Sequence, residues 1–318
     1  MLKNEQQIKP EYRQAVSKAL HYINQNLTAD ISLETLARIA NYSAFHFQKI
    51  FLLAISETPK QYVMRLRLER AAHYLKVFPD LPIYDIAMGC GFSSPSVFSR
   101  AFRNYYKLTA EKFRLVPLSD TSAIANHFHK INKSFVTDNS FFPVGILNNN
   151  TDSQEYTQII PPPTVKTFNA IKIACIATTL NHPESISFAF KSLMQWVIPN
   201  ELHTINTKYI GIWLDTPFYT SLDKCRYLAG IILNEDIKSK KGIEIISMKE
   251  GKYAGFSMTG NIECTLNQLI SLNHQYLDDM GYEMAEIICY EIFDECPAYK
   301  SFEQINKNIL LPVKTKQK

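Results

Sequence analysis

The hydrophobic pattern of the first third of the chain is helical. Over residues 10–117 apolar side chains return every three or four positions, as in one short segment at Leu33, Leu36, Ala37 and Ala40. That spacing places them along one face of a helix. A longer pattern of the same kind over 59–77 predicts one long helix. We therefore expect residues 1–117 to form an all-helical domain.

The pattern changes twice after that domain. Residues 118–163 are rich in Asn, Ser and Thr and close with three consecutive prolines, which is typical of a linker. From 164 to 318, strand-like runs alternate with helical ones. This alternation predicts a separate α+β domain.

The helical domain contains an internal repeat. Segments 37–51 and 87–102 both begin with Ala, reach an aromatic residue five positions later, and end in the pattern F-x-[KR]-x-F. The small residue lets two helices cross closely, and Asn41 or Gly91 can take the positive φ that a tight turn often needs. A serine that can cap the next helix follows in each copy. The repeat predicts a double helix-turn-helix, in which the second helix of each unit can enter the major groove of DNA.

Charge is distributed unevenly between the two predicted domains. Residues 1–117 hold 16 Lys and Arg against 9 Asp and Glu, whereas the rest of the chain holds 18 against 21. A basic domain joined to a mildly acidic one indicates that only the first meets a polyanion.

Several classes of protein are excluded by the composition. No run of 18 or more apolar residues is present, and the N-terminus lacks the apolar core of a secretory signal, so we expect a cytoplasmic protein. The six cysteines form no C-x-x-C pair, and no His stands at zinc-ligand spacing from them. We expect them in the core, with no disulfide framework, metal or cofactor.

The N-terminal residues resemble a known family. The segment after Cys90 reads GFSSPSVFSRAFRNYYKLTAEKFR and is similar to the second helix-turn-helix of AraC/XylS regulators, in particular the compact branch of MarA, SoxS and Rob. The resemblance covers about residues 12–114. Ser56 stands where the family often has a glycine, and Ala110 where it usually has proline. Both departures lie in turns and leave the reading surfaces unaffected.

The resemblance implies which side chains contact DNA bases. The family's base-reading positions correspond here to Phe45, Gln48, Lys49, Pro95, Ser96, Val97 and Arg100. Gln suits adenine, and Lys or Arg suits guanine. The second unit has few polar side chains at these positions, so it is expected to act mainly through phosphates and DNA shape.

The C-terminal domain also repeats itself, with a period near 80 residues. Each copy reads as a strand, a helix (about 184–200 and about 262–280), a second strand and a third strand. The second strands, 208–214 and 287–293, each lead into an Asp and a Pro. Two strand-helix-strand-strand repeats predict a pseudo-two-fold domain with a cleft where the halves meet.

This second repeat resembles the GyrI-like effector-binding module. The similarity covers about 164–315 and is strongest at 224–227 and 309–313. In that family a glutamate on the penultimate strand faces the binding site, and several members bind hydrophobic cations between aromatic rings. The corresponding ligand-binding residues here are Glu291, Trp213, Tyr227, Phe256 and Phe293. Phe293 replaces the family's usual tyrosine.

The sequence leaves several functions open. The first is a DNA-binding transcriptional regulator, not an enzyme, that senses a small hydrophobic or cationic effector, with RNA polymerase as a further candidate partner. A second is a C-terminal hydrolase with Glu291 as general base and a hydroxyl from Tyr227 or Tyr253. A third is a C-terminal protein-interaction module. Glu291 could also be a structural acid paired with Arg226.

Overall fold

The structure is a computed structural model. It describes residues 9–116, 162–180, 184–215, 220, 224–234, 237, 242–260, 265, 268–269, 276–277, 279–286 and 288–316. The chain divides into two compact units, Met1–His127 and Phe128–Lys318. Nearly all of the expected linker at 118–163 lies outside the described residues.

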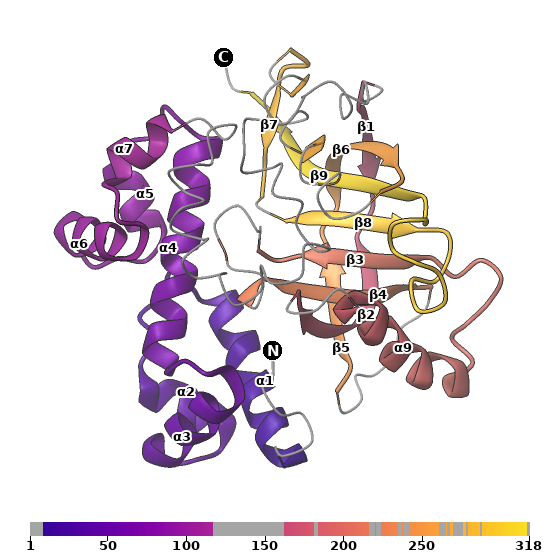
Figure 1. Cartoon of the computed structure of the whole chain (residues 1–318), viewed down its shortest axis with the longest axis horizontal. Coiled ribbons are helices and arrows are strands. Elements are labelled where there is room, and N and C mark those ends of the chain that lie inside the picture. Colours follow the sequence, from indigo (N-terminus) through magenta and orange to yellow (C-terminus); the bar gives the residue numbers. More distant parts are fainter. Residues whose placement is uncertain are drawn as a thin grey trace, which may run out of the picture. The chain divides into compact units, whose positions relative to one another are not determined.

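The first unit is helical, and its elements follow the predicted repeat. The helices are α1 (Pro10–Gln25), α2 (Leu33–Ala40), α3 (Ala44–Ile55), α4 (Pro59–Val77), α5 (Ile83–Gly89), α6 (Pro95–Tyr106) and α7 (Ala110–Leu115). The long helix predicted over 59–77 is α4. It runs between α1–α3 at one end and α5–α7 at the other (Figure 1).

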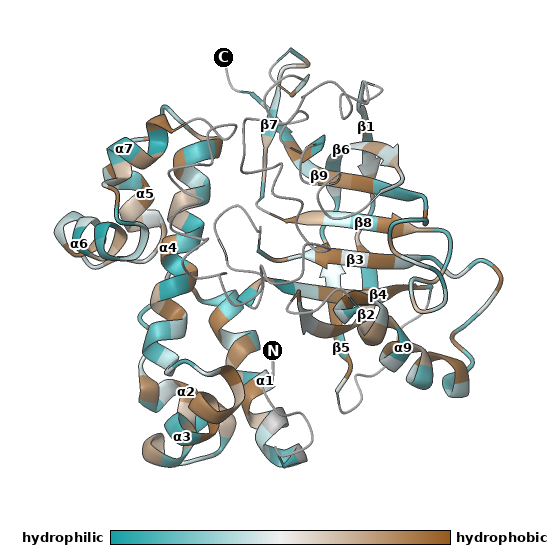
Figure 2. Cartoon of the chain, in the orientation of Figure 1, coloured by the Kyte–Doolittle hydropathy of each residue, from teal (hydrophilic) through white to brown (hydrophobic). Residues whose placement is uncertain are grey.

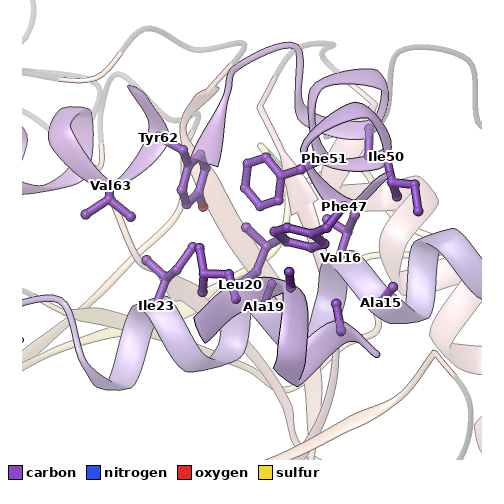
Figure 3. Packing of buried hydrophobic residues seen from close by; sticks show 14 of the residues in the cluster. Ala15, Val16, Ala19, Leu20, Ile23, Phe47, Ile50, Phe51, Tyr62 and Val63 are labelled. Atoms are coloured by element: carbon purple, nitrogen blue, oxygen red, sulfur yellow. The ribbon is translucent and has the colours of Figure 1, made fainter. Parts of the chain in front are cut away.

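Each end of α4 has its own core. At the first end, Phe47 and Phe51 of α3 pack against Ile23 of α1 and Tyr62 of α4 (Figure 3). The Phe47 and Phe51 rings are fully buried, and their centroids lie 5.6 Å apart. Burial of each such side chain contributes roughly 1.5–3 kcal/mol to folding. This face of α3 therefore packs in the core, and only the opposite face is exposed.

The second end repeats this arrangement with its own aromatic residues. Phe98 and Phe102 of α6 are fully buried, and the Phe102 ring lies 5.2 Å from that of Phe113 on α7. The Lys76 ammonium of α4 donates to the main-chain carbonyls of Phe113 and Val116 at the end of α7. Burial lowers the pKa of Lys76 to about 8.

The second unit is built on one antiparallel sheet. Its strands are β1 (Thr164–Phe168), β2 (Ile171–Thr179), β3 (Tyr209–Trp213), β4 (Arg226–Leu233), β5 (Glu244–Met248), β6 (Gly251–Met258), β7 (Tyr282–Met284), β8 (Cys289–Phe293) and β9 (Lys307–Thr315). Within the described residues the strand order is β1-β6-β9-β8-β3-β4-β2-β5, with β7 paired to β9. Helix α9 (Ser185–Val197) continues into the short helix η2 (Ile198–Asn200) and contacts β2 and β4.

The strand order has the expected two-fold pattern. The first repeat is β2-α9-β3-β4, and β6, β8 and β9 occupy the mirrored places of the second. The two halves meet where β3 pairs with β8. Most of the helix expected at 262–280 lies outside the described residues. Strands β1, β5 and β7 lie outside the strand-helix-strand-strand repeats and were not predicted from the sequence.

Both faces of the central strands are buried. Side chains of Ile210, Tyr290 and Leu310 belong to an apolar cluster on one face, whereas Gly211, Glu291 and Ile309 alternate onto the opposite face. The central strands are accordingly hydrophobic along much of their length (Figure 2). Any polar group on either face is therefore removed from water.

Candidate DNA-reading surface and effector site

The first helix-turn-helix is shaped by two local devices. Asn41 ends α2 in the left-handed conformation at φ 60°. The Ser43 hydroxyl oxygen then accepts a hydrogen bond from the His46 main-chain N–H at 3.3 Å and caps α3. Such a cap contributes about 1 kcal/mol. The His46 ring lies tilted against Tyr42, with ring centroids 5.2 Å apart.

The second helix-turn-helix has a glycine at the corresponding turn. Gly91 has φ +84°, and a Cβ on it would stand 2.8 Å from the Thr28 Cα and 2.9 Å from the Thr28 carbonyl oxygen. Ser94 caps α6 by accepting from the Val97 N–H at 3.3 Å. Gly91 therefore lets this turn lie directly against the loop that follows α1.

The predicted base-reading side chains lie mostly on the exposed sides of α3 and α6. Phe45 is 70% exposed and Val97 is 40% exposed, although both are apolar. The remaining positions are exposed except Pro95, which is half-buried: Gln48, Lys49, Pro95, Ser96 and Arg100. The Lys49 Nζ lies 4.2 Å from the centre of the Phe45 ring. This cation–π contact holds the ammonium group beside an exposed aromatic surface.

A buried polar network along α4 connects the two helix-turn-helix motifs of the helical unit. Arg65 donates to Glu57 at 2.8 Å and to Glu69 at 3.1 Å, and the Tyr105 hydroxyl of α6 donates to Glu69 at 3.2 Å. Burial opposes the Arg65 charge, but Glu69 and Glu57 outweigh it and hold the Arg65 pKa above its usual value. Arg67 adds hydrogen bonds to the loop after α1, at Leu27 and Ala29. These contacts fix how α3 and α6 are held on α4.

The candidate effector residues share one face of the sheet. Strand register places Gly211 opposite Glu291, and Trp213 opposite Tyr227 on β4. Phe293 lies two residues beyond Glu291, and Phe256 is two strands away, across from Ile309. All five predicted residues are buried: Glu291, Trp213, Tyr227, Phe256 and Phe293.

Glu291 receives a hydrogen bond across β3. The Tyr227 hydroxyl donates to Glu291 Oε2 at 3.0 Å, and both side chains are fully buried. The hydroxyl passes over Gly211, where a Cβ would lie 1.7 Å from it. Burial and the Glu291 charge raise the pKa of Tyr227 well above its usual value, so it remains a hydrogen-bond donor.

Lys307 is a second buried partner of the same carboxylate. Its Nζ lies 3.6 Å from Glu291 Oε1, and the lysine side chain is fully buried. The ammonium also donates to the Gly260 carbonyl at 2.9 Å and lies 3.5 Å from the centre of the Phe302 ring. Lys307 was not predicted from the sequence. An alignment of the third strands of the two repeats would have found it, because Lys307 faces Phe293 just as Tyr227 faces Trp213.

The structure corrects one alternative for Glu291. Arg226 does not pair with it: the guanidinium binds the Asp215 carboxylate through two hydrogen bonds of 2.6 Å, and the Arg226 main-chain N–H adds a third at 2.9 Å. Arg226 and Tyr227 are consecutive in a strand and point to opposite faces. Arg226 is therefore on the wrong side of the sheet to reach Glu291.

The aromatic candidates contribute in different ways. The Trp213 ring meets Tyr227 edge-on at 5.7 Å, and its Nε1 is a buried donor without a hydrogen-bond acceptor among the described residues. The Phe293 ring is packed between Phe190 of α9 and Phe302, each 5.9 Å away. Trp213 and Tyr227 thus lie near Glu291, whereas Phe293 also joins the face to α9.

The cysteines of the described residues agree with a core role. Cys90, Cys175, Cys225 and Cys289 are buried, and Cys296 is half-buried. Cys264 lies outside the described residues. Among the residues that the structure does describe, no group of His, Cys, Asp and Glu could hold a metal ion, and no helix is long and apolar enough to cross a membrane.

Comparison with known proteins identifies both halves. Residues 36–115 match the model of a helix-turn-helix domain, and residues 161–314 match that of a GyrI-like small molecule binding domain. PqrA of Proteus vulgaris, described as a probable transcription factor, is 39% identical over 84 residues, which are 26% of this chain and 68% of PqrA. The chain belongs to the AraC/XylS family.

Two further similarities each cover about a third of this AraC/XylS protein. YbfP, an HTH-type transcriptional regulator of Bacillus subtilis, is 32% identical over 103 residues, which are 32% of this chain but only 35% of YbfP. A crystal structure of an AraC-type regulator from Chromobacterium violaceum is 25% identical at a TM-score of 0.31 and covers 33% of this chain and 94% of that one. The two matched domain models make the AraC/XylS protein a DNA-binding transcriptional regulator with a GyrI-like small-molecule-binding domain.

Proposed function

We propose that this regulator changes its DNA-bound activity when a small hydrophobic molecule binds beside Glu291. One observation carries the proposal: within the described residues, the fully buried Oε1 of Glu291 accepts no hydrogen bond. The Lys307 ammonium stays 3.6 Å from this atom, and a buried polar atom without a hydrogen bond is costly. A ligand that donates a hydrogen bond to Oε1 would recover that cost, and neighbouring aromatic rings supply apolar contact.

The ligand-contacting residues of the proposal are Glu291 with Trp213, Tyr227, Phe256 and Phe293. Because all five are buried, a ligand has to separate side chains that now touch one another. This links ligand binding to a local rearrangement of the GyrI-like domain, and an effector that binds only the rearranged state shifts the population toward it.

On the DNA side, we propose that the exposed polar residues of α3 and α6 read base edges in two successive major grooves. Gln48 and Lys49 would act from α3 and Arg100 from α6, with Phe45 and Val97 offering apolar contact to thymine methyl groups. Pro95 and Ser96 lie at the start of α6, where main-chain N–H groups and the helix dipole favour phosphate. Contact with RNA polymerase stays a prediction from the sequence.

The proposal is tested in two steps on the full chain. Duplexes selected from a random library give a target sequence, and the fluorescence of Trp213 is then titrated with lipophilic cations, bile-acid-like anions and neutral aromatic compounds. Trp213→Phe isolates the signal, because Trp196 is the only other tryptophan. A saturable response that weakens in Glu291→Gln and alters affinity for the selected duplex supports a ligand sensor. Absence of any response across the panel contradicts it.

One observation also supports the hydrolase alternative. Glu291 and the Tyr227 hydroxyl are in direct contact at 3.0 Å, the combination of general base and hydroxyl that such a reaction needs. Turnover of reactive esters or epoxides by the purified chain, abolished in Glu291→Gln, would support it. Binding without turnover would leave the sensor as the function.

A further inference from the structure

The two-fold pattern of the sheet brings two equivalent positions to one carboxylate. Across β3 and β4, Trp213 faces Tyr227; across β8 and β9, Phe293 faces Lys307. Gly211 and Glu291 face each other where the halves meet. Tyr227 and Lys307 are thus counterparts in the two repeats, and each reaches one oxygen of Glu291, at 3.0 Å and 3.6 Å.

These two counterparts differ in charge, and that difference decides the electrostatics of the site. Glu291 and Lys307 are the fully buried charged side chains in the described part of the sheet unit. The other buried carboxylate there, Asp215, is neutralised by Arg226. The Glu291 charge is therefore balanced inside the protein before any ligand arrives.

Two further contacts fix the position of the Lys307 ammonium. Its ammonium donates to the Gly260 carbonyl at 2.9 Å and lies 3.5 Å from the Phe302 ring centre. A cationic ligand that approached Glu291 would have to displace this ammonium from those partners or lie beside it. In an interior of low dielectric constant the repulsion between two such cations is strong, and the ligand would still lose its hydration.

An uncharged ligand could form hydrogen bonds with two buried polar atoms of the site. In the described part of the structure, Glu291 Oε1 accepts no hydrogen bond and Trp213 Nε1 donates none, and both atoms are buried. One hydroxyl or amide group could donate to the first, and an acceptor on the same molecule could take a hydrogen bond from the second. Aromatic rings on the ligand would pack against Trp213 and Tyr227.

We infer that Lys307 is an internal counter-ion for Glu291, and that the effector site takes an uncharged hydrophobic molecule with a hydrogen-bond donor and discriminates against lipophilic cations. The inference rests on the proposed function of the GyrI-like domain and specifies its ligand class. The sequence predicted a hydrophobic or a cationic effector. We favour the uncharged hydrophobic one, because Lys307 already supplies the cation that balances Glu291.

Three probes of nearly the same shape test this inference: neutral triphenylmethanol, cationic methyltriphenylphosphonium and anionic triphenylacetate. Each is titrated into the full chain while Trp213 fluorescence is followed, with Trp213→Phe as the control for Trp196. We expect triphenylmethanol to bind wild-type protein at least about tenfold more tightly than the phosphonium.

Two substitutions change the buried charge in opposite directions. Lys307→Met leaves Glu291 unbalanced and should reverse the preference toward methyltriphenylphosphonium. Glu291→Gln leaves Lys307 unbalanced and should favour triphenylacetate, and this variant serves if Lys307→Met does not fold. Lys307→Arg retains the charge and should retain the wild-type order of affinities.

The possible failures are distinguishable. Phosphonium binding to wild-type protein as tight as that of triphenylmethanol, or an order of affinities that neither charge change alters, would overturn the counter-ion role alone. If no probe bound wild-type protein, the proposed sensor function would be lost, and the inference with it.

Discussion

The hydroxyl of Tyr227 lies over Gly211, in space that any other residue's Cβ would occupy. A Cβ on Gly211 would stand 1.7 Å from the hydroxyl oxygen and 3.1 Å from Glu291 Oε2. The hydrogen bond between Tyr227 and Glu291 therefore depends on the absence of a side chain at a third position, on the strand that runs between them.

Gly211→Ala should destabilise the sheet unit by about 1–3 kcal/mol, because the added methyl group displaces the Tyr227 ring from a packed interior. Both tryptophans of the chain, Trp196 and Trp213, belong to this unit, so urea unfolding followed by tryptophan fluorescence reports on it selectively. In a Tyr227→Phe background the hydroxyl oxygen is absent, and Gly211→Ala should reduce the free energy of unfolding by less. Equal penalties in both backgrounds would mean that the hydroxyl is not what fills the space.

Gly91→Ala should destabilise the helical unit by about 1–3 kcal/mol, since the residue has φ +84° and its Cβ would press on Thr28. Gly89→Ala is the matched control: nothing lies within 4 Å of its Cβ, and it ends helix α5. That change should be neutral or stabilise by up to about 1 kcal/mol. Helical circular dichroism during thermal unfolding distinguishes the two variants, and similar behaviour of both would contradict the Gly91–Thr28 contact.

Arg65→Leu should cost about 3–5 kcal/mol, because Glu57 and Glu69 would lose the buried cation that they share. Arg70→Leu on the same helix changes the same charge at a half-buried position and should cost less than about 1 kcal/mol. Chemical unfolding followed by circular dichroism compares them. A comparable loss for both would indicate that net charge, not the network, is responsible.

Lys49→Ala and Arg100→Ala should each weaken binding to the selected duplex by about 1–3 kcal/mol and relax base preference at one position. Arg103→Ala, an exposed position in the last turn of α6, should reduce affinity evenly across sequences. Competition binding against single-base variants of the duplex makes the comparison, and affinity should fall steeply with salt. Unchanged base preference in both test variants would refute base reading by these residues.

Acid should destabilise the helical unit through His73. The ring nitrogens are buried, and burial lowers the pKa of His73 from its usual 6.5 to about 3. Between those values the unfolded chain binds a proton that the folded chain does not, so stability falls as pH drops from 6.5 toward 3. The loss should approach about 1.4 kcal/mol per pH unit. His73→Gln should flatten this part of the pH profile of the unfolding free energy, and identical slopes would contradict a buried neutral imidazole.

The repeats were readable from the sequence because they depend on local chemistry. The turn at Gly91, the helix caps at Ser43 and Ser94, and the buried rings of Phe47 and Phe98 each follow from residue type and helical period. Even the departures from the family pattern have a local explanation: Ser56 takes the left-handed conformation at φ 62° in place of glycine. The strand-like runs that form β2, β3, β4, β6, β8 and β9 were likewise visible along the chain.

The partners of Glu291 were not readable in this way. The sequence left Arg226 open as its partner, but the pleat of β4 turns Arg226 toward Asp215 and Tyr227 toward Glu291. Lys307 lies 16 positions from Glu291 in the chain and meets it only because β8 and β9 pair in one particular register. The link between Arg65 and Tyr105 through Glu69 is similarly invisible until α4 and α6 are packed.

The sequence by itself determined the helix-turn-helix repeat and the strand-helix-strand-strand repeat. Both follow from periodicity, turn chemistry and residue type, which act over a few neighbouring positions. The candidate reading residues and Glu291 came from the resemblance to known families, and they stay predictions. Only the tertiary structure decided that Tyr227 and Lys307 share the Glu291 carboxylate, and thus which charge the site already contains. Side-chain partners across a sheet are fixed by strand register, and a shift of one residue would turn each of these groups to the other face.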